Sequence, residues 1–432
     1  MNTSIFRSGN IQNVISLDPF AIEKTEVLFG PGSVMYGSDA IGGVMSFQTL
    51  TPQFSLDSNP FIKGSSVMRF STANNEKTYH FDVNAGWKKL ALLTSFSSNE
   101  YGDLKMGSNG PEEYLRPFYV QRIDSTDVVV TNSDPRIQAP SGYSQMNMMQ
   151  KLRYRPSDKW DIQYGFHYSE TSNYSRYDRH IRYKNGLPRY GEWYYGPQKW
   201  MMNNLSVTSF ANNALYQKMT LRLAQQSFEE SRISRDFNDV TRETRVEKVE
   251  AYSVNLDFLK ELSEKNNLHY GFEYVFNDVN STGINEDIST GIASDGPSRY
   301  PMSTWYSYGF YLNDLHKFSD KFKMLSSVRY TGFGLDAVFD TTFYPFQFTS
   351  AEMNNSAITG SLGFIFRPNE SWIISVNGAT AFRSPNVDDM GKVFDSEPGS
   401  VVVPNPNLEA EYAYNGDIGI AKVFGGFMEI EL

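Results

Sequence analysis

Apolar and polar side chains alternate with a period of two along several segments of this chain, and this pattern constrains its fold more than any other feature. In KWDIQYGFHYSE (159–170), the even positions from Trp160 to Tyr168 are apolar or aromatic, and the odd positions from Asp161 to Ser169 are small or polar. TYHFDVNAGW (78–87) and LHYGFEYVF (268–276) repeat the design. Such strands separate an apolar from a polar environment. We therefore expect a transmembrane antiparallel β-barrel with lipid outside and a polar lumen.

Composition agrees with this class. Only 40% of the 432 residues are hydrophobic, mean hydropathy is −0.45, and no run approaches the ~20 apolar residues that a membrane helix needs. A barrel escapes that test, because only one face of each strand meets lipid. Aromatic residues make up 15% of the chain, which suits two interfacial girdles.

Charge and cysteine content exclude other classes. The net charge of −10 argues against a nucleic-acid partner, and the absence of cysteine excludes disulfides and thiolate metal sites. The first residues, MNTSIFRSGN, lack the basic start and apolar core of a secretory signal. For an exported protein we therefore expect the natural start to lie further upstream.

Connections of alternating length divide the chain into about fifteen strands of about ten residues each. Short turns are predicted at 87–89, 156–158, 216–218, 262–266, 319–321, 368–370 and 425–426. Longer polar stretches, predicted as outer loops, lie at 99–143, 171–202, 229–247, 277–304, 334–355 and 382–408. This alternation is typical of outer-membrane barrels.

A glycine-rich segment precedes the strands. In IEKTEVLFGPGSVMYGSDAIGGV (22–44), Ile22, Val27 and Leu28 have the character of a buried strand, and a tight turn follows. The motif positions are Gly30, Pro31, Gly32, Tyr36, Gly37, Gly42 and Gly43.

In its residue types and their order, this segment resembles the end of the plug domain of TonB-dependent outer-membrane receptors. The resemblance implies the end of a plug at 1–55 and part of a 22-stranded barrel at 56–432, with about seven further strands after this chain and an energy-coupling box before it. Phe29 stands where relatives usually carry an arginine, so any salt bridge of that arginine is missing here.

A second signature lies between Phe382 and Leu408. It is similar to two boxes of haem receptors, one formed by Phe382, Arg383, Ser384 and Pro385, and the other by Asn405, Pro406, Asn407 and Leu408. The histidine expected between the boxes is absent, so haem is the less favoured ligand. The alternative is structural, with Asn405 and Pro406 setting the turn that starts the next strand.

One predicted outer loop is both basic and aromatic. We expect it to contact an anionic ligand, because guanidinium groups pair with oxyanions and rings stack on flat ligands. The candidate ligand-binding residues are Arg176, Arg179, His180, Arg182, Trp193, Tyr194 and Tyr195. The alternative is that these side chains meet charged lipid head groups.

The remaining polar residues point to no chemistry. His80, His167 and His269 are expected to line the lumen, and no spacing of acids matches a calcium loop. We expect no catalytic residues, no cofactor and no metal site, since no nucleophile elbow or phosphate loop occurs.

The resemblance implies a receptor in the outer membrane of a Gram-negative cell that imports a scarce ligand. The expected partners are outer-membrane lipid, a TonB-type energy-transducing protein in the periplasm, and a small anionic ligand such as a ferric chelate. A ferric siderophore is the first expectation, with cobalamin or an oligosaccharide as alternatives. A passive porin-like channel, or a loop platform such as an adhesin or a protease, stays open as another class.

Overall fold

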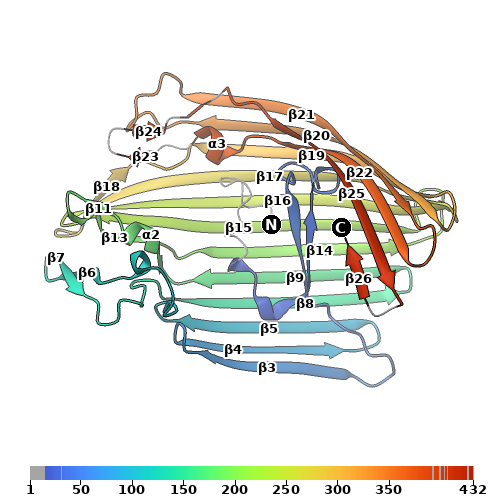
Figure 1. Cartoon of the computed structure of the whole chain (residues 1–432), viewed down its shortest axis with the longest axis horizontal. Coiled ribbons are helices and arrows are strands. Elements are labelled where there is room, and N and C mark those ends of the chain that lie inside the picture. The colour runs from blue at the N-terminus through green and yellow to red at the C-terminus, as the bar shows by residue number, and fades with distance from the viewer. Residues whose placement is uncertain are drawn as a thin grey trace.

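The computed structural model describes residues 15–30, 32–391, 394–397, 400–402, 404–405, 407–425 and 428–431. Its main feature is an 18-stranded sheet in which long neighbouring strands pair antiparallel. Figure 1 shows these strands side by side in a strongly curved sheet, with the N-terminal segment, residues 15–55, against its inner side.

Fourteen strands of this sheet have 11 or more residues. They are β3 (Phe61–Ser71), β4 (Glu76–Gly86), β5 (Leu90–Tyr101), β8 (Tyr143–Ser157), β9 (Trp160–Thr171), β14 (Lys199–Phe210), β15 (Lys218–Asp236), β16 (Thr241–Ser263), β17 (Asn266–Asp287), β19 (Met302–Lys317), β20 (Phe322–Val338), β21 (Ser350–Phe366), β22 (Trp372–Arg383) and β25 (Glu411–Phe424). With β26 (Met428–Glu431), they match the expected number of about fifteen strands.

Shorter elements cluster at one end of the sheet. Figure 1 shows this end on the left, opposite the short turns. These elements are β6 (Phe118–Ile123), β7 (Thr126–Thr131), β10 (Tyr174–Ser175), β11 (Tyr183–Lys184), β12 (Leu187–Pro188), β13 (Tyr190–Tyr195), β18 (Ile292–Gly296), β23 (Phe394–Glu397), β24 (Ser400–Val402) and the helices α2 (Tyr177–His180) and α3 (Val387–Gly391). We call this end the long-loop end.

The strands have the two faces that the alternation predicts. Tyr79 and Phe81 are 54% and 46% exposed, whereas His80 between them is 3% exposed. In β9, His167 and Ser169 are buried while Tyr164 is exposed. The aromatic side chains therefore form the outer surface of the curved sheet, and polar side chains line its inner side.

The N-terminal segment lies within the curve, because residues from several parts of the wall contact it. It contains β1 (Ile22–Phe29), α1 (Ser33–Tyr36) and β2 (Gly43–Thr49). On one side Ser97 Oγ donates to Asp18 Oδ2 at 2.6 Å, and on another Asn313 Nδ2 lies 3.2 Å from Met35 Sδ.

The expectation that β1 is a buried strand is wrong. Val27 and Leu28 are 49% and 45% exposed, and Phe29 is 90% exposed. Among the described residues β1 pairs with β2 in a two-stranded sheet that is separate from the wall, so the wall strands do not bury its side chains. The glycine requirement is real at Gly43, where φ is +156° and a Cβ would lie 2.6 Å from the Leu28 carbonyl oxygen.

Two predicted outer loops are largely strand and a third is half strand, and this prediction is corrected. β15 continues to Asp236 and β16 begins at Thr241, so 229–247 is mostly a hairpin. β17 continues into 277–304, and β20 and β21 extend into 334–355.

The strands at this hairpin also exceed the expected length of about ten residues. β15, β16 and β17 have 19, 23 and 22 residues. The reason is that the charged residues of this region form ion pairs between neighbouring strands, although their density in the sequence suggested a loop. Arg232 Nη1 donates to Glu247 Oε2 at 2.7 Å, and Lys248 Nζ lies 3.4 Å from Glu229 Oε2. Opposite charges on facing strands stabilise the pairing.

Helices contribute little to this fold. Over the part of the chain that the structure describes, none is long and apolar enough to cross a membrane.

Candidate functional site

An arginine-rich cavity of about 460 Å³ lies at the long-loop end, and we call it the arginine cavity. Its basic lining comprises Arg179, Arg189, Arg232, Arg235, Arg245 and Arg299. Its acidic and aromatic lining comprises Asp236, Asp239, Glu243, Tyr190, Trp193 and Tyr344. Carboxylates pair with Arg232, Arg235 and Arg245, so the attraction for anions rests on the remaining arginines of the lining.

Some of these arginines hold the walls together. Arg235 donates from Nη1 and Nη2 to the two carboxylate oxygens of Asp127, at 2.7 and 2.8 Å, and from Nε to Glu192. Burial by itself would raise the pKa of Asp127, but hydrogen bonds from Arg235 and the backbone N–H of Asn238 outweigh it, so the pKa is lowered. This pair fixes the β6–β7 hairpin to the end of β15.

Arg179 and Arg189 differ, because the Nε atom of each is buried and has no hydrogen-bond partner among the described residues. The nearest carboxylate to Arg179 Nε, that of Asp178, is 3.7 Å away. Burial, and then the charges of Arg176 and Arg182, lower the pKa of Arg179. An unpaired buried donor is costly, and an incoming oxyanion would relieve both this cost and the mutual repulsion.

Aromatic rings lie against the same two arginines. The Arg179 guanidinium carbon is 5.8 Å from the centroid of the Trp193 ring, and that of Arg189 is 5.0 Å from the centroid of the Tyr190 ring. The cavity therefore combines charged donors with flat apolar faces. This combination suits a ligand that is both anionic and planar in part.

The structure brings several of the predicted ligand-binding residues together. Arg179 and Trp193 line the cavity. Arg176 supports them from behind, since its Nη1 donates to Tyr195 Oη at 3.0 Å and its guanidinium lies 5.3 Å from the Trp193 ring. His180 Nε2 is 2.8 Å from the Trp193 carbonyl oxygen, and burial lowers the pKa of His180.

Two of the predicted residues lie elsewhere. Arg182 is exposed to solvent and does not line the cavity. Tyr194 sits in β13, where it pairs with Ile233 of β15, and it is also absent from the lining. Neither residue has a cavity contact through which to reach a ligand in this arrangement.

Most of the cavity lining comes from residues that were not among the sequence candidates. Arg232, Arg235 and Arg245 enter from β15 and β16, and Arg299 enters from the segment before β19. The available signal was the recurrence of arginine between residues 232 and 245. It resembles the basic run at 176–189, with which it shares the cavity.

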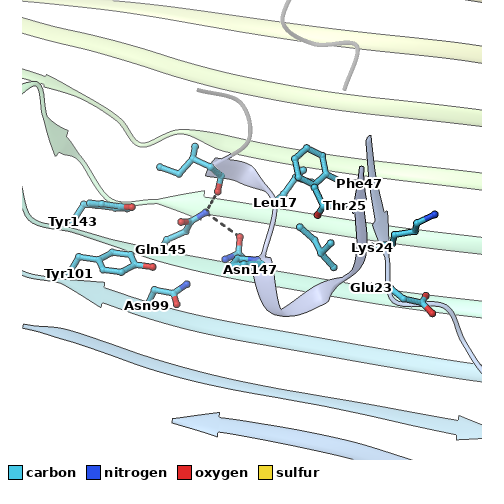
Figure 2. Close-up of a pocket in the computed structure, with 13 residues that line it drawn as sticks. Leu17, Glu23, Lys24, Thr25, Phe47, Asn99, Tyr101, Tyr143, Gln145 and Asn147 are labelled. Atoms are coloured by element: carbon cyan, nitrogen blue, oxygen red, sulfur yellow. Dashed lines mark hydrogen bonds between the residues drawn. The ribbon is translucent and has the colours of Figure 1, made fainter. Parts of the chain in front are cut away.

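A second cavity, of about 610 Å³, lies between the N-terminal segment and the wall (Figure 2). Tyr101 and Tyr143 line the wall with ring centroids 4.8 Å apart, and Figure 2 shows Asn99, Gln145 and Asn147 beside them. Gln145 Nε2 donates to the Ile15 carbonyl oxygen at 2.6 Å. Its wall residues are uncharged, so it lacks the anion preference of the arginine cavity.

No metal site emerges from the described residues, since none of their His, Asp and Glu side chains form a group of three or more that could hold an ion.

Two family descriptions match this chain. "TonB dependent receptor-like, beta-barrel" matches residues 152–431, well over half of the chain, and "TonB-dependent Receptor Plug Domain" matches residues 2–44. The chain belongs to the TonB-dependent receptor family. The predicted family and fold class are confirmed, and the family consists of receptors and transporters rather than enzymes. The division at residues 55 and 56 stays a prediction.

Curated relatives include both vitamin B12 and iron receptors. The vitamin B12 transporter BtuB of Vibrio vulnificus is 23% identical over 415 residues, which cover 94% of this chain and 52% of that protein. The ferrioxamine B receptor of Salmonella typhimurium is 26% identical over 178 residues, covering 39% of this chain and 23% of that receptor. The chain thus spans about half the length of the vitamin B12 transporter.

Solved structures share the fold. The copper transporter OprC superposes with a TM-score of 0.70 at 12% identity, covering 98% of this chain and 60% of that one. The FrpB iron transporter from Neisseria meningitidis superposes with a TM-score of 0.66 at 17% identity, covering 95% of this chain and 59% of that one.

The two family motifs meet inside the structure. Ser384 N donates to Ser38 Oγ at 3.0 Å, and Phe382 N donates to Ser33 Oγ at 3.4 Å. Of the plug motif, Gly37 has φ +79°, a region that favours glycine. Two motif positions, 31 and 406, lie outside the described residues.

The second box makes a turn. Asn405 Oδ1 accepts from Asn407 N at 3.0 Å, and Leu408 packs against a buried apolar cluster that includes Met390. This geometry fits the structural alternative for the second box, because an asparagine that bonds the backbone two residues on stabilises a turn.

Proposed function

We propose that this chain is part of an energy-coupled outer-membrane receptor that binds and imports an anionic ferric chelate of the siderophore type. The observation that carries this proposal is the pair of buried, unpartnered guanidinium Nε atoms of Arg179 and Arg189 in the arginine cavity. A carboxylate or catecholate oxygen of a chelate would accept from them, while Trp193 and Tyr190 flank its flat parts.

The remaining parts of the mechanism follow from the architecture. The aromatic outer faces of the strands would contact outer-membrane lipid, and the long-loop end would face the medium. The N-terminal segment fills part of the lumen, so a ligand passes only when that segment shifts. A TonB-type protein in the periplasm would supply the energy for this shift. A passive porin-like channel is disfavoured, because the segment lies within the curve.

Cobalamin is a second candidate, because the vitamin B12 transporter of Vibrio vulnificus matches along 94% of this chain. The charge of the arginine cavity favours an anionic ferric chelate over cobalamin. Haem has less support, since no histidine lies between residues 382 and 408.

The test is binding of four probes to the whole protein in isolated outer membranes: ferric citrate, a ferric tris-catecholate, ferrioxamine B and vitamin B12. We expect one of the two anionic chelates to bind, and Arg179→Gln and Arg189→Gln each to weaken that binding by about 10- to 100-fold, the range for a lost charged hydrogen bond. Arg182→Gln is the matched control, because Arg182 is exposed outside the cavity. Binding of vitamin B12 alone, or equal loss in all three variants, would overturn the proposal.

A further inference from the structure

We infer that the segment from Arg383 to Gly391, which contains α3, couples the arginine cavity to the N-terminal segment, and that Arg383 is a residue that positions α1, beside the hydrogen bonds that Ser33 and Ser38 accept from the wall. This rests on the proposed function only in that the arginine cavity takes the ligand. The positioning contacts themselves are properties of the fold. A continuous series of side-chain contacts carries the inference, from the cavity wall through α3 to Asp39.

The first contacts run from the cavity to α3 through Tyr300, which is 1% exposed. Arg299, a cavity residue, donates from Nε to Tyr300 Oη at 3.2 Å, and the Arg232 guanidinium lies 5.9 Å from the same ring. Tyr300 Oη in turn donates to Asp388 Oδ1 at 2.7 Å. A change at the cavity arginines therefore reaches α3 through one phenol group.

α3 is packed so that it moves as one piece. Val387 and Met390 are fully buried. Asn386 Oδ1 accepts from the backbone N–H groups of Asp388 and Asp389, at 2.9 and 3.1 Å. A Cβ at Gly391 would lie 2.5 Å from Pro301, so the end of α3 touches the residue that follows Tyr300. Tightly packed contacts of this kind transmit small displacements.

The last contacts run from α3 to the N-terminal segment. Asp389 accepts a hydrogen bond from Arg383 Nη2, and Arg383 Nε lies 3.5 Å from Asp39 Oδ1. Arg383 Nη1 also pairs with Glu411 of β25 at 3.2 Å. Arg383 thus joins the barrel wall, α3 and the N-terminal segment at one guanidinium group.

Asp39 is in a strained position. Its φ is +74°, in the left-handed region that a non-glycine residue adopts at a cost. A strained residue next to hydrogen bonds to Ser33 and Ser38 and an ion contact with Arg383 gives the segment a reason to move when the ion contact weakens. An anion that draws Arg299 or Arg232 away from Tyr300 would shift Asp388, then Asp389 and Arg383, and so loosen α1.

The test measures the accessibility of α1 to a maleimide reagent. This chain has no cysteine, so Met35→Cys, at a position 43% exposed, provides a label site once any cysteine elsewhere in the whole protein is replaced. In outer membranes we expect Tyr300→Phe and Asp39→Asn each to raise the labelling rate by about 3- to 10-fold, within the range for coupled sites. The double variant should label no faster than the faster single variant, because both substitutions interrupt the same series of contacts between the cavity and Asp39.

Matched controls separate coupling from damage. Tyr194→Phe makes the same change at the long-loop end, in β13 and outside the lining of the arginine cavity, and it should label as the parent does. Asp388→Asn keeps an acceptor for Tyr300 and should stay close to the parent, whereas Asp388→Ala should not. A parent-like rate in Tyr300→Phe, or additive rates in the double variant, would overturn the inference.

A ligand arm tells the two proposals apart. Saturating ferric citrate should raise labelling in the parent and leave Tyr300→Phe unchanged. If neither ferric citrate nor the ferric tris-catecholate alters labelling but the variants behave as expected, the choice of ligand fails and the coupling stands. If ferric citrate binds and Tyr300→Phe still responds to it, the coupling fails and the ligand proposal stands.

Discussion

At the scale of single residues, what distinguishes the arginines of this receptor is whether their buried donors already have hydrogen-bond acceptors. Arg235 is fully engaged by Asp127 and Glu192, so its role is structural. Arg179 and Arg189 share the same cavity but keep a buried Nε without a partner. Sequence alone could not separate these two kinds of arginine, because the partners of Arg235 lie 108 and 43 residues away.

His180 supports a prediction about acidity. Burial depresses its pKa in the folded loop, while in an unfolded loop the pKa returns to about 6.5. The stability it contributes is therefore complete above that value and decreases as the pH falls below it, since the unfolded loop takes up the proton first. We expect proteolysis within residues 171–199 to accelerate between pH 7.5 and pH 5, and His180→Gln to remove that dependence. An equal acceleration in the variant would exclude His180 as the cause.

At the scale of elements, the long-loop end is built from strands that extend beyond the region where the alternation is visible. The alternation correctly predicted the exposed and buried faces of β4 and β9, because one face of these strands meets an apolar medium. It failed in β15 and β16, where Arg232, Glu230 and Glu247 pair with one another and both faces are polar. Paired charges in a strand and solvated charges in a loop have the same sequence signature, so only the fold separates them.

The β6–β7 hairpin offers a test of this architecture. Arg235→Met leaves the buried carboxylate of Asp127 without its main partner, and we expect a loss of about 3–5 kcal/mol in local stability. Hydrogen exchange over residues 118–131 measures it. Arg122→Gln is the control, because Arg122 contacts Asp127 only at 3.4 Å and is partly exposed, so its removal should cost less than about 1 kcal/mol.

The companion variant for the hairpin removes both charges. Asp127→Leu combined with Arg235→Met replaces the ion pair with apolar side chains, and it should recover much of the lost protection. Protection as low as that of Arg235→Met alone would mean that the hydrogen bond that Asp127 Oδ2 accepts from Asn238 N matters more than the charge pair.

At the scale of the whole molecule, the N-terminal segment is held differently on its two sides. Towards β8 it is fixed by Lys151, whose Nζ donates to Thr49 Oγ1 and to the Leu50 carbonyl oxygen, both at 2.7 Å. Towards β22 it is held by hydrogen bonds from the Phe382 and Ser384 backbone to Ser33 and Ser38, and through Arg383 and the strained Asp39. On the first side, Lys151 anchors the segment through backbone and hydroxyl oxygens. The second side is the one that responds to a ligand in the arginine cavity. A segment held in this way can swing without leaving the lumen.

The anchor side can be tested by removing it. Lys151→Met keeps the length of the buried side chain but takes away every donor to Thr49 and Leu50, and we expect the segment to lose about 3 kcal/mol of local stability, the scale of a charged hydrogen bond. Hydrogen exchange over residues 15–55 should rise, and cells should become sensitive to antibiotics too large for ordinary pores. Lys89→Met is the control, because Lys89 donates to the Pro156 carbonyl oxygen in a short turn and does not reach the segment. Unchanged exchange in Lys151→Met would mean that the opposite side alone holds the segment, and the assignment of anchor and responding side would then be reversed.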